Sequence, residues 1–313
     1  MEFSIVFQSI INITFLILIG VLLSKTFSFN DDTRKLFINL IVNIAMPCII
    51  LSSIFKVDLN ARIFTSILIV FVLSILINLL GIGIGWILSI TFQGDSPKKR
   101  EIALMSGLGN TGFIGIPLCA TLIGPEAALY AAIFDAGVDF TIWTIGVIIL
   151  QKDRKFALQT LKSMLNMPTA AIVFGLAVAY FNIKPPSFIV HLTDQLAGLA
   201  TPLAMFYIGI LIMTIQRAKV REKGHQLWIP LMVKLILLPF SVAFLIHFFG
   251  LSPEIIQTLL VQSMMPTLTL ASILFAKYSA DEEMGAITTI ISTIISLSTI
   301  PLMLFLINLF GVF

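Results

Sequence analysis

Long apolar stretches recur along the whole chain and constrain its fold more than any other feature. A helix needs about 20 apolar residues to cross the hydrocarbon core of a bilayer, and the chain contains ten stretches that qualify. They cover residues 3–24, 36–55, 63–92, 101–123, 126–150, 168–183, 188–215, 228–249, 254–277 and 284–311. With 58% hydrophobic and only 11% charged residues, the chain lacks the polar surface of a water-soluble domain. The sequence therefore predicts an all-α membrane protein with ten transmembrane helices.

The distribution of basic residues between the loops supports this count. With ten spans, one face of the membrane collects fifteen of the 19 lysines and arginines, the other face collects three, and Lys234 lies within a span. Cytoplasmic loops are enriched in Lys and Arg, so we expect a multi-pass protein of the cell membrane with both termini extracellular. The longest loop, residues 151–167, is basic and amphipathic. This pattern is typical of a helix that lies on the inner surface of the bilayer.

Prolines and polar residues recur at a constant offset in the two halves of the chain. Three pairs are separated by 155 or 156 residues: Pro47 and Pro202, Asn110 and Pro266, and Asn78 and Lys234. Because each half holds five spans, the second half is inverted relative to the first, which is an architecture of secondary transporters. The expected repeats cover residues 1–150 and 168–313, joined by a cytoplasmic linker at 151–167.

Spans four and nine each contain helix breakers near the middle of the membrane. In span four a glycine cluster surrounds Asn110 and is followed by Pro117, and in span nine the breaker is Met265-Pro266. A rise of about 1.5 Å per residue places both close to the midplane. The helix N-terminus after each break favours an anion, so the two breaks together predict a carboxylate site. Kinks that serve only close helix packing are the alternative.

Gly107, Gly109 and Gly112 also have the G-x-G-x-x-G spacing of a dinucleotide-binding loop. That motif requires a strand before it, a helix after it and an acidic residue about 20 positions further on. Here the preceding apolar run is short, Pro117 interrupts the following helix, and Asp135 comes 28 residues after Gly107 in the next span. The glycines therefore indicate a break in a membrane helix. We expect neither a cofactor nor a nucleic-acid partner.

Four charged residues lie inside the expected spans: Asp135, Asp139, Asp194 and Lys234. Asp135 and Asp139 are four residues apart and share one helix face. Two carboxylates in a medium of low dielectric cannot both ionise cheaply, so the pair predicts coupling to H⁺ or Na⁺, with hydrogen bonding to a neighbouring helix as the alternative. Asp194 is expected at the outer interface. Lys234 either extends to the inner surface or pairs with an Asp or a bound carboxylate.

Three stretches resemble the auxin efflux carrier family: GNTGFIGIPL in span four, KLILLPF in span eight and MPTLTLASILFAKY in span nine. The resemblance extends over essentially the whole chain. It implies the crossed-helix fold of the bile-acid sodium symporters, in which spans 1, 2, 6 and 7 form a scaffold and spans 3–5 and 8–10 form a transport domain. Bacterial members are often described as malate or malonate permeases, and plant members are the PIN-FORMED auxin carriers. The resemblance to the plant members also implies a homodimer, but the long hydrophilic loop of many of them is missing here.

These observations predict a secondary active transporter, and no enzyme, that moves a small organic anion such as malate, malonate or an auxin-like acid by alternating access. Movement of the transport domain against the scaffold, as an elevator, provides the access change. The candidate substrate-binding residues are Asn43, Gly109, Asn110, Thr111, Pro117, Met265, Pro266, Thr267 and Thr269. The candidate coupling residues are Asp135, Asp139, Lys234, Asn78 and Gln262, with Na⁺ as the candidate metal ion. A passive channel, or an intramembrane enzyme that uses the Asp135/Asp139 pair, is the alternative.

Overall fold

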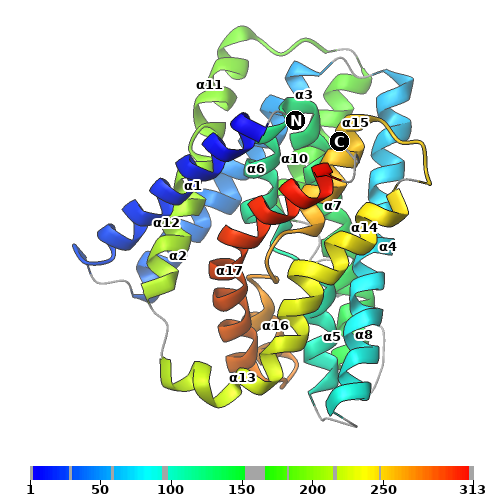
Figure 1. Ribbon diagram of the computed structural model, residues 1–313. Helices are drawn as coiled ribbons and strands as arrows, with labels where there is room; N and C mark the ends of the chain where they lie inside the picture. Colours follow the sequence, from blue (N-terminus) through cyan, green and yellow to red (C-terminus); the bar gives the residue numbers. More distant parts are fainter. Residues whose placement is uncertain are drawn as a thin grey trace.

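The computed structural model describes residues 3–27, 30–57, 60–93, 98–151, 166–181, 183–213, 217–246 and 248–309. Within these ranges every regular element is a helix, and the only extended pairing is an isolated antiparallel bridge between Gly109 and Thr267. The predicted all-α class is therefore confirmed, and Figure 1 shows the helices side by side as an elongated bundle.

The helices have the following bounds. The first half contains α1 (Phe3–Leu23), α2 (Asp31–Leu40), η1 (Ile41–Ala45), α3 (Met46–Lys56), α4 (Ala61–Gln93), α5 (Lys99–Gly107), η2 (Thr111–Gly115), α6 (Ile116–Leu122), α7 (Pro125–Thr141), η3 (Ile142–Gly146) and α8 (Val147–Leu150). The second half contains α10 (Met167–Tyr180), α11 (Ser187–Ala197), α12 (Ala200–Met213), α13 (Arg217–Met232), η5 (Val233–Leu237), α14 (Leu238–Ile246), α15 (Pro253–Ser263), α16 (Ala271–Lys277) and α17 (Glu282–Leu309). The η elements are single π-helical turns inserted into longer helices.

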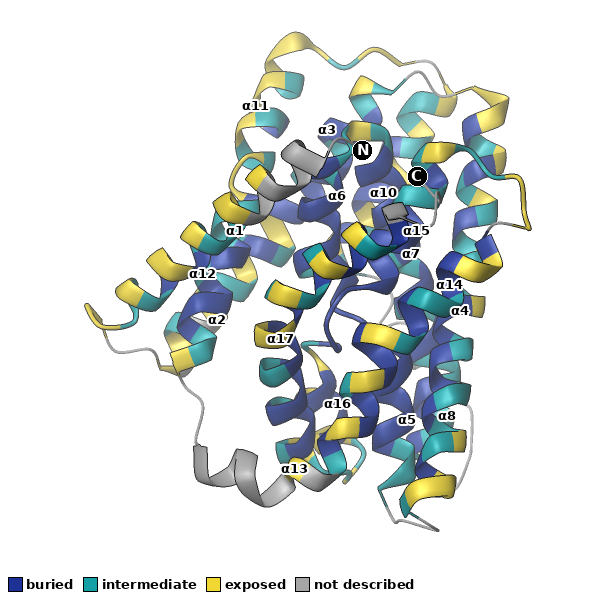
Figure 2. Cartoon of the chain, in the orientation of Figure 1, coloured by how far each residue is buried: buried dark blue, intermediate teal, exposed yellow. Residues whose placement is uncertain are grey.

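The outward faces of the long helices are apolar, as lipid contact requires. On α4, Leu68, Val72 and Leu76 follow at four-residue intervals and are 64%, 46% and 53% exposed. Exposed residues line the outer faces of α1, α4 and α14, while the middle of the bundle is buried (Figure 2). Large exposed apolar surfaces are unusual for a protein in water. The chain is a multi-pass membrane protein.

Among the residues that the structure describes, six continuous helices are long and apolar enough to cross a membrane: Lys35–Lys56, Ala61–Gln93, Pro125–Leu150, Ser187–Met213, Gln226–Ile246 and Glu282–Ile307. The other four expected spans appear as shorter or interrupted helices. Spans four and nine are each split in two, span six is reduced to Met167–Tyr180, and the apolar part of span one is Ile11–Leu23. The amphipathic helix expected at 151–167 lies almost wholly outside the described residues.

Three of the π-helical turns precede a proline by the same spacing. η1 ends two residues before Pro47, η2 two residues before Pro117, and η5 two residues before Pro239. A proline cannot donate its backbone nitrogen and its ring collides with the carbonyl four residues earlier. The wider π-turn re-registers the backbone there, so that each helix continues through its proline without breaking.

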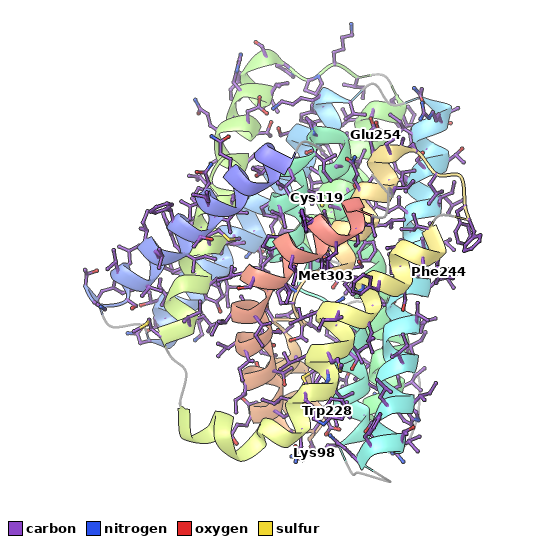
Figure 3. The ribbon with its side chains drawn as sticks, in the orientation of Figure 1. Lys98, Cys119, Trp228, Phe244, Glu254 and Met303 are labelled. Atoms are coloured by element: carbon purple, nitrogen blue, oxygen red, sulfur yellow. The ribbon has the colours of Figure 1, made fainter. Side chains whose placement is uncertain are left out.

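The two interrupted helices enter the bundle from opposite ends. Lys98, directly before α5, and Glu254, in the first turn of α15, lie at opposite ends of the molecule (Figure 3). In the view of Figure 1, α1 begins and α17 ends towards the end of the molecule where α15 begins. Because α5 and α15 run towards each other, their broken ends meet inside the protein.

Candidate functional site

The broken ends of the two helices are joined by backbone hydrogen bonds. The backbone nitrogen of Asn110 donates to the carbonyl of Pro266 at 2.7 Å, and that of Leu268 donates to the carbonyl of Leu108 at 3.2 Å. These bonds form the short antiparallel bridge. An unsatisfied backbone group costs several kcal/mol inside a bilayer, and the pairing removes part of that cost. The crossing is therefore a fixed piece of backbone on which side chains are displayed.

A cavity of about 270 Å³ opens beside this crossing. Its volume is close to the lower end of the usual range for small-molecule sites, roughly 300–1,000 Å³. The lining residues are Ile38, Val42, Met46, Gly109, Asn110, Thr111, Gly112, Phe113, Asp135, Val138, Asp139, Trp143, Asn166, Pro168, Tyr207, Leu268, Thr269, Leu270 and Ile273. Both breaks and both predicted aspartates thus contribute to one mostly apolar chamber.

The carboxyl group of Asp135, on α7, lies against the N-terminus of the helix that follows the first break. The hydroxyl of Thr111 donates to Oδ1 of Asp135 at 2.5 Å, and the backbone of Gly112 also hydrogen-bonds this carboxyl group. Asn110 stands at the N-cap position, but its own side chain makes no capping hydrogen bond. The first N–H groups of a helix have no acceptor within it. Asp135 supplies that acceptor from a neighbouring helix.

Asp139, one turn further along α7, is held by a residue from the second half of the chain. The side-chain nitrogen of Asn166 donates to Oδ2 of Asp139 at 2.7 Å. Asn166 is also the N-cap of α10, because its side-chain oxygen accepts a hydrogen bond from the backbone nitrogen of Thr169 at 2.9 Å. One amide group therefore caps α10 and ties it to α7.

Two polar side chains in the cavity have no hydrogen-bond partner among the described residues. Asn110 is only 6% exposed, its backbone is fixed by Pro266, and its side-chain amide is free. Thr269, beyond the second break, also lines the cavity with its hydroxyl unpaired. Buried polar groups are normally satisfied, so a free amide next to a capped helix N-terminus marks a place for a polar ligand.

Several predicted substrate residues lie away from the cavity. Asn43 is exposed to the outside and donates to the side chain of Asn39 at 3.1 Å. Met265 and Pro266 are buried behind the crossing, and Thr267 turns to Ser292 of α17, with 2.9 Å between the two hydroxyl oxygens. Pro117 differs most from the expectation, because the break lies at residues 108–110 and the proline sits within the first turn of α6.

Three predicted coupling residues also lie outside the cavity lining. Lys234 is 1% exposed and its Nζ lies 3.4 Å from the carbonyl of Gly107, so it neither reaches the surface nor pairs with an Asp among the described residues. Gln262 donates to the carbonyl of Ala131 at 3.2 Å. Asn78 is buried with both polar side-chain atoms unpaired. Asp194, expected at the interface, bonds Ser52 and Lys56 on α3.

Besides aliphatic residues, the cavity lining contains one polar and three aromatic residues that the sequence did not predict: Asn166, Phe113, Trp143 and Tyr207. Asn166 had a local signal, since an Asn two residues before a proline at the start of an apolar stretch is a typical N-cap. The three aromatic residues had none, because their position in apolar helices does not reveal whether they face lipid or a cavity.

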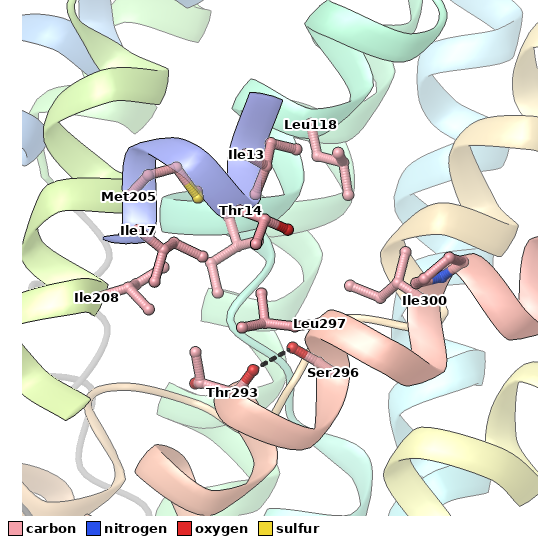
Figure 4. Close-up of a pocket in the computed structure, with 12 residues that line it drawn as sticks. Ile13, Thr14, Ile17, Leu118, Met205, Ile208, Thr293, Ser296, Leu297 and Ile300 are labelled. Atoms are coloured by element: carbon pink, nitrogen blue, oxygen red, sulfur yellow. Dashed lines mark hydrogen bonds between the residues drawn. The ribbon is translucent and has the colours of Figure 1, made fainter. Parts of the chain in front are cut away.

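A second, smaller cavity lies between α1, α6, α12 and α17. Its volume is about 30 Å³, and its lining is almost wholly apolar, including Ile17, Leu118, Met205 and Leu297. The hydroxyl of Ser296 in this wall is satisfied by the carbonyl of Thr293 (Figure 4). The hydroxyl of Thr293 likewise donates to a backbone carbonyl, and no basic side chain among the described residues lines this cavity to favour an anion.

Comparison with known proteins places the chain among transporters. A family model described as membrane transport protein matches residues 5–304. A protein of Methanothermobacter thermautotrophicus named "Uncharacterized transporter" is 20% identical over 94% of this chain and 96% of its own length. A protein of Methanocaldococcus jannaschii with the same description is 27% identical over 92% and 94%. A "Putative malonate transporter" of Rhizobium meliloti is 26% identical over 64% of each chain.

Proposed function

The chain belongs to the membrane transport protein family, which is the auxin efflux carrier family that its motifs resemble, and we propose that it is a secondary active transporter of a small organic anion. The observation that carries the proposal is the cavity at the crossing, where a free Asn110 amide adjoins a helix N-terminus and two aspartates. The malonate named for the Rhizobium relative is one member of the substrate class. Transport is coupled to H⁺ or Na⁺ through Asp135 and Asp139.

The proposed architecture is ten membrane crossings in two inverted repeats, residues 1–150 and 168–313. The support comes from the opposite directions in which α5 and α15 enter the bundle, and from the pairing of their broken ends across Gly109 and Thr267. Discontinuous helices that meet near the midplane from two inverted repeats form the substrate site in many secondary transporters.

The packing of the helices supports a division into scaffold and transport domain. α1 packs against α12, and α10 and α11 pack against α3, which groups spans 1, 2, 6 and 7. Gly20 on α1 faces the backbone of Phe206 so closely that no Cβ fits between them. α4 packs against α5 and α7, and α7 packs against α15, in the other group, while α3 and α7 form the main contact between the two groups. The cavity lies between the two groups, where a relative movement changes access to it.

The cavity lies on the side of the crossing that the basic loops mark as cytoplasmic. Trp143 is close to the end of span five, Asn166 is at the start of span six, and Ile273 is beyond the second break. All three helix ends lead to that face. The proposal therefore describes this conformation as open to the cytoplasm, with both chain termini outside.

Saturable uptake and counterflow in proteoliposomes test the proposal. The full chain should take up labelled monocarboxylates or malonate, and unlabelled substrate inside the vesicles should accelerate entry of the labelled compound. A channel gives flux without counterflow, and an enzyme changes the chemical identity of the recovered label. Either result, or no saturable uptake of any carboxylate, contradicts the proposal.

A further inference from the structure

We propose that Asp135 is the resident occupant of a single carboxylate site at the crossing, and that a substrate carboxylate replaces it while Asp135 takes up one proton. This inference rests on the proposed function and deepens it in two respects. It names the substrate class as a monocarboxylate with an apolar body, and it sets the ratio at one proton for each anion.

The carboxylate site lies at the N-terminus of the helix that follows the first break. The helix Thr111–Leu122 begins at the first break, and its first N–H groups favour a negative charge. In this structure the donors there are directed at Asp135, through the Thr111 hydroxyl at 2.5 Å and the backbone of Gly112. The anion site is therefore built, and the protein's own carboxyl group fills it.

The side-chain amide of Asn110 is a hydrogen-bond donor at this site that Asp135 does not use. The amide of Asn110 borders the same helix end, is nine-tenths buried, and has no partner among the described residues. It is free to donate to an incoming carboxylate, and the Thr269 hydroxyl faces the same cavity from the second break. A substrate carboxylate at this point gains the Asn110 amide in addition to the donors that Asp135 gives up.

The charged residues of the cavity lining favour a substrate with a single carboxylate. Its described lining contains two aspartates and no Lys, Arg or His. Lys234 lies behind Gly109, where a Cβ on that glycine would meet its Nζ at 3.0 Å, and Lys277 stacks over the outer part of the wall at Trp143, 5.2 Å from the ring centre. A second carboxylate on the substrate thus has no basic partner, whereas Phe113, Leu270 and other apolar residues suit an apolar body.

Other ionisable groups near Asp135 are the alternatives to it as the proton acceptor. On its own helix, Asp139 accepts a hydrogen bond from Asn166, and Tyr130 donates to Glu126 outside the lining. Tyr207 of α12 is the remaining ionisable residue in the lining. The ionisable groups on the described helices packed against α7 are absent from the lining: Cys48, Lys56, Arg62, Cys119, Tyr180 and Glu254.

The exchange then follows from electrostatics. Two negative charges cannot share one helix N-terminus at low dielectric, so the substrate binds when a carboxyl oxygen of Asp135 accepts a proton from the buffered bulk solution. The Thr111 hydroxyl and the Gly112 N–H are then free to donate to the substrate. One negative charge enters with one positive charge, and the net charge of the cavity stays constant.

Proton uptake on binding tests this exchange directly. Hexanoate is titrated into the purified full chain by calorimetry in two buffers with different ionisation enthalpies, which gives the number of protons bound per ligand. We expect about one proton for the wild type and none for Asp135→Asn, which keeps a neutral acceptor for Thr111. The matched control Asp194→Asn removes a carboxyl group that lies outside the cavity lining and should still take up about one proton. Hexanoate binding without proton uptake by the wild type, or uptake retained in Asp135→Asn, overturns the exchange.

Two measurements on the wild type keep the inference testable even where the variant fails to fold. Linkage predicts that the Kd for hexanoate rises about tenfold per pH unit while Asp135 is ionised in the free protein, and a Kd that stays flat from pH 6 to pH 9 contradicts this. Malonate should bind at least tenfold more weakly than hexanoate at pH 7.5, and equal affinity overturns the substrate class. Saturable uptake without proton binding removes the exchange but leaves the transporter, whereas no uptake removes both.

Discussion

The two helix breaks are paired through one backbone bridge, but their side chains have different roles. At the first break, the side-chain amide of Asn110 has no hydrogen-bond partner among the described residues. Thr111 lines the cavity, and its hydroxyl donates to Asp135. At the second break, the position equivalent to Thr111 is Thr267, whose backbone nitrogen and hydroxyl are both bound to Ser292 of α17. The carbonyl of Leu268 is bound by Thr289. The first break therefore displays its polar groups to a ligand, and the second is anchored to its neighbouring helix.

This difference suggests that the first break binds the substrate and the second stabilises the crossing. A symmetric pair of breaks gives two helix ends at one depth, but one small anion needs only one set of donors. The second break is then free to stabilise the crossing. Substitutions at the first break should therefore impair transport without loss of folded protein, whereas those at the second should reduce stability first.

The largest expected effect comes from filling the space at the first break. A Cβ on Gly112 would lie 2.7 Å from Oδ2 of Asp135 and 2.9 Å from Cε of Met46, so Gly112→Ala displaces the aspartate. A shift of about 1 Å in a site costs on the order of a hundredfold in rate, and we expect such a loss in initial uptake. Gly83→Ala is the matched control, because a Cβ there meets nothing within 4 Å. Equal activity of the two variants refutes the prediction.

The second prediction separates the two threonines of span nine. Thr267→Val removes the hydroxyl contact to Ser292 but keeps the backbone hydrogen bond to the same side chain, and it should lower the free energy of unfolding by about 1 kcal/mol. Thr269→Val removes a free hydroxyl in the cavity and should raise the KM by about fivefold while the thermal midpoint in detergent stays unchanged. If Thr267→Val changes the KM and Thr269→Val changes the stability, the contrast between the breaks is reversed.

A smaller effect is expected where α7 is tied to α10. Asn166→Ala removes the 2.7 Å hydrogen bond to Asp139 and the cap of α10. In the proposed domain division this bond crosses from the transport domain to the scaffold, so its loss should change the maximal rate by about threefold, as expected for a hydrogen bond worth roughly 0.6 kcal/mol in a membrane protein. Thr169→Val leaves the side chain of Asn166 in place and serves as the control. A change confined to the KM argues against a role in domain movement.

The smallest effect is expected far from both breaks. Lys56 and Asp194 form an ion pair at 2.8 Å with side chains that are 44% and 32% exposed. Exposed pairs contribute less than about 1 kcal/mol, so Lys56→Ala should leave both uptake and the thermal midpoint nearly unchanged. A large loss of uptake would show that charges outside the crossing control transport.

The sequence predicts the crossing better than it predicts the contacts made there. Helix breakers at a constant offset correctly placed Asn110 beside Pro266, because two helices that enter from opposite ends and break at similar depths meet at their breaks. The four-residue spacing also placed Asp135 and Asp139 on one face. The sequence could not reveal that Asp135 caps the helix after the first break, since that contact joins two helices whose relative rotation depends on packing.

Pro117 and Thr267 are two residues whose predicted roles at the site do not match their contacts in the structure. The helix Thr111–Leu122 continues through Pro117, because the preceding π-turn accommodates the proline ring. Thr267 has the composition of a ligand-binding residue, but Ser292, 25 residues further along the chain, binds it. Which way a side chain points at a break is set by tertiary neighbours, and these are not encoded in local spacing.

The central claim is that the free amide of Asn110 binds the substrate carboxylate at the first break. The most direct measurement compares initial uptake of labelled hexanoate and malonate into proteoliposomes by Asn110→Ala and Asn43→Ala, at equal amounts of folded protein. Losing a hydrogen bond to a charged group costs about 1.5–3 kcal/mol. The account therefore predicts roughly a thirtyfold loss of kcat/KM for Asn110→Ala and wild-type uptake for Asn43→Ala, whereas wild-type uptake by Asn110→Ala would contradict it.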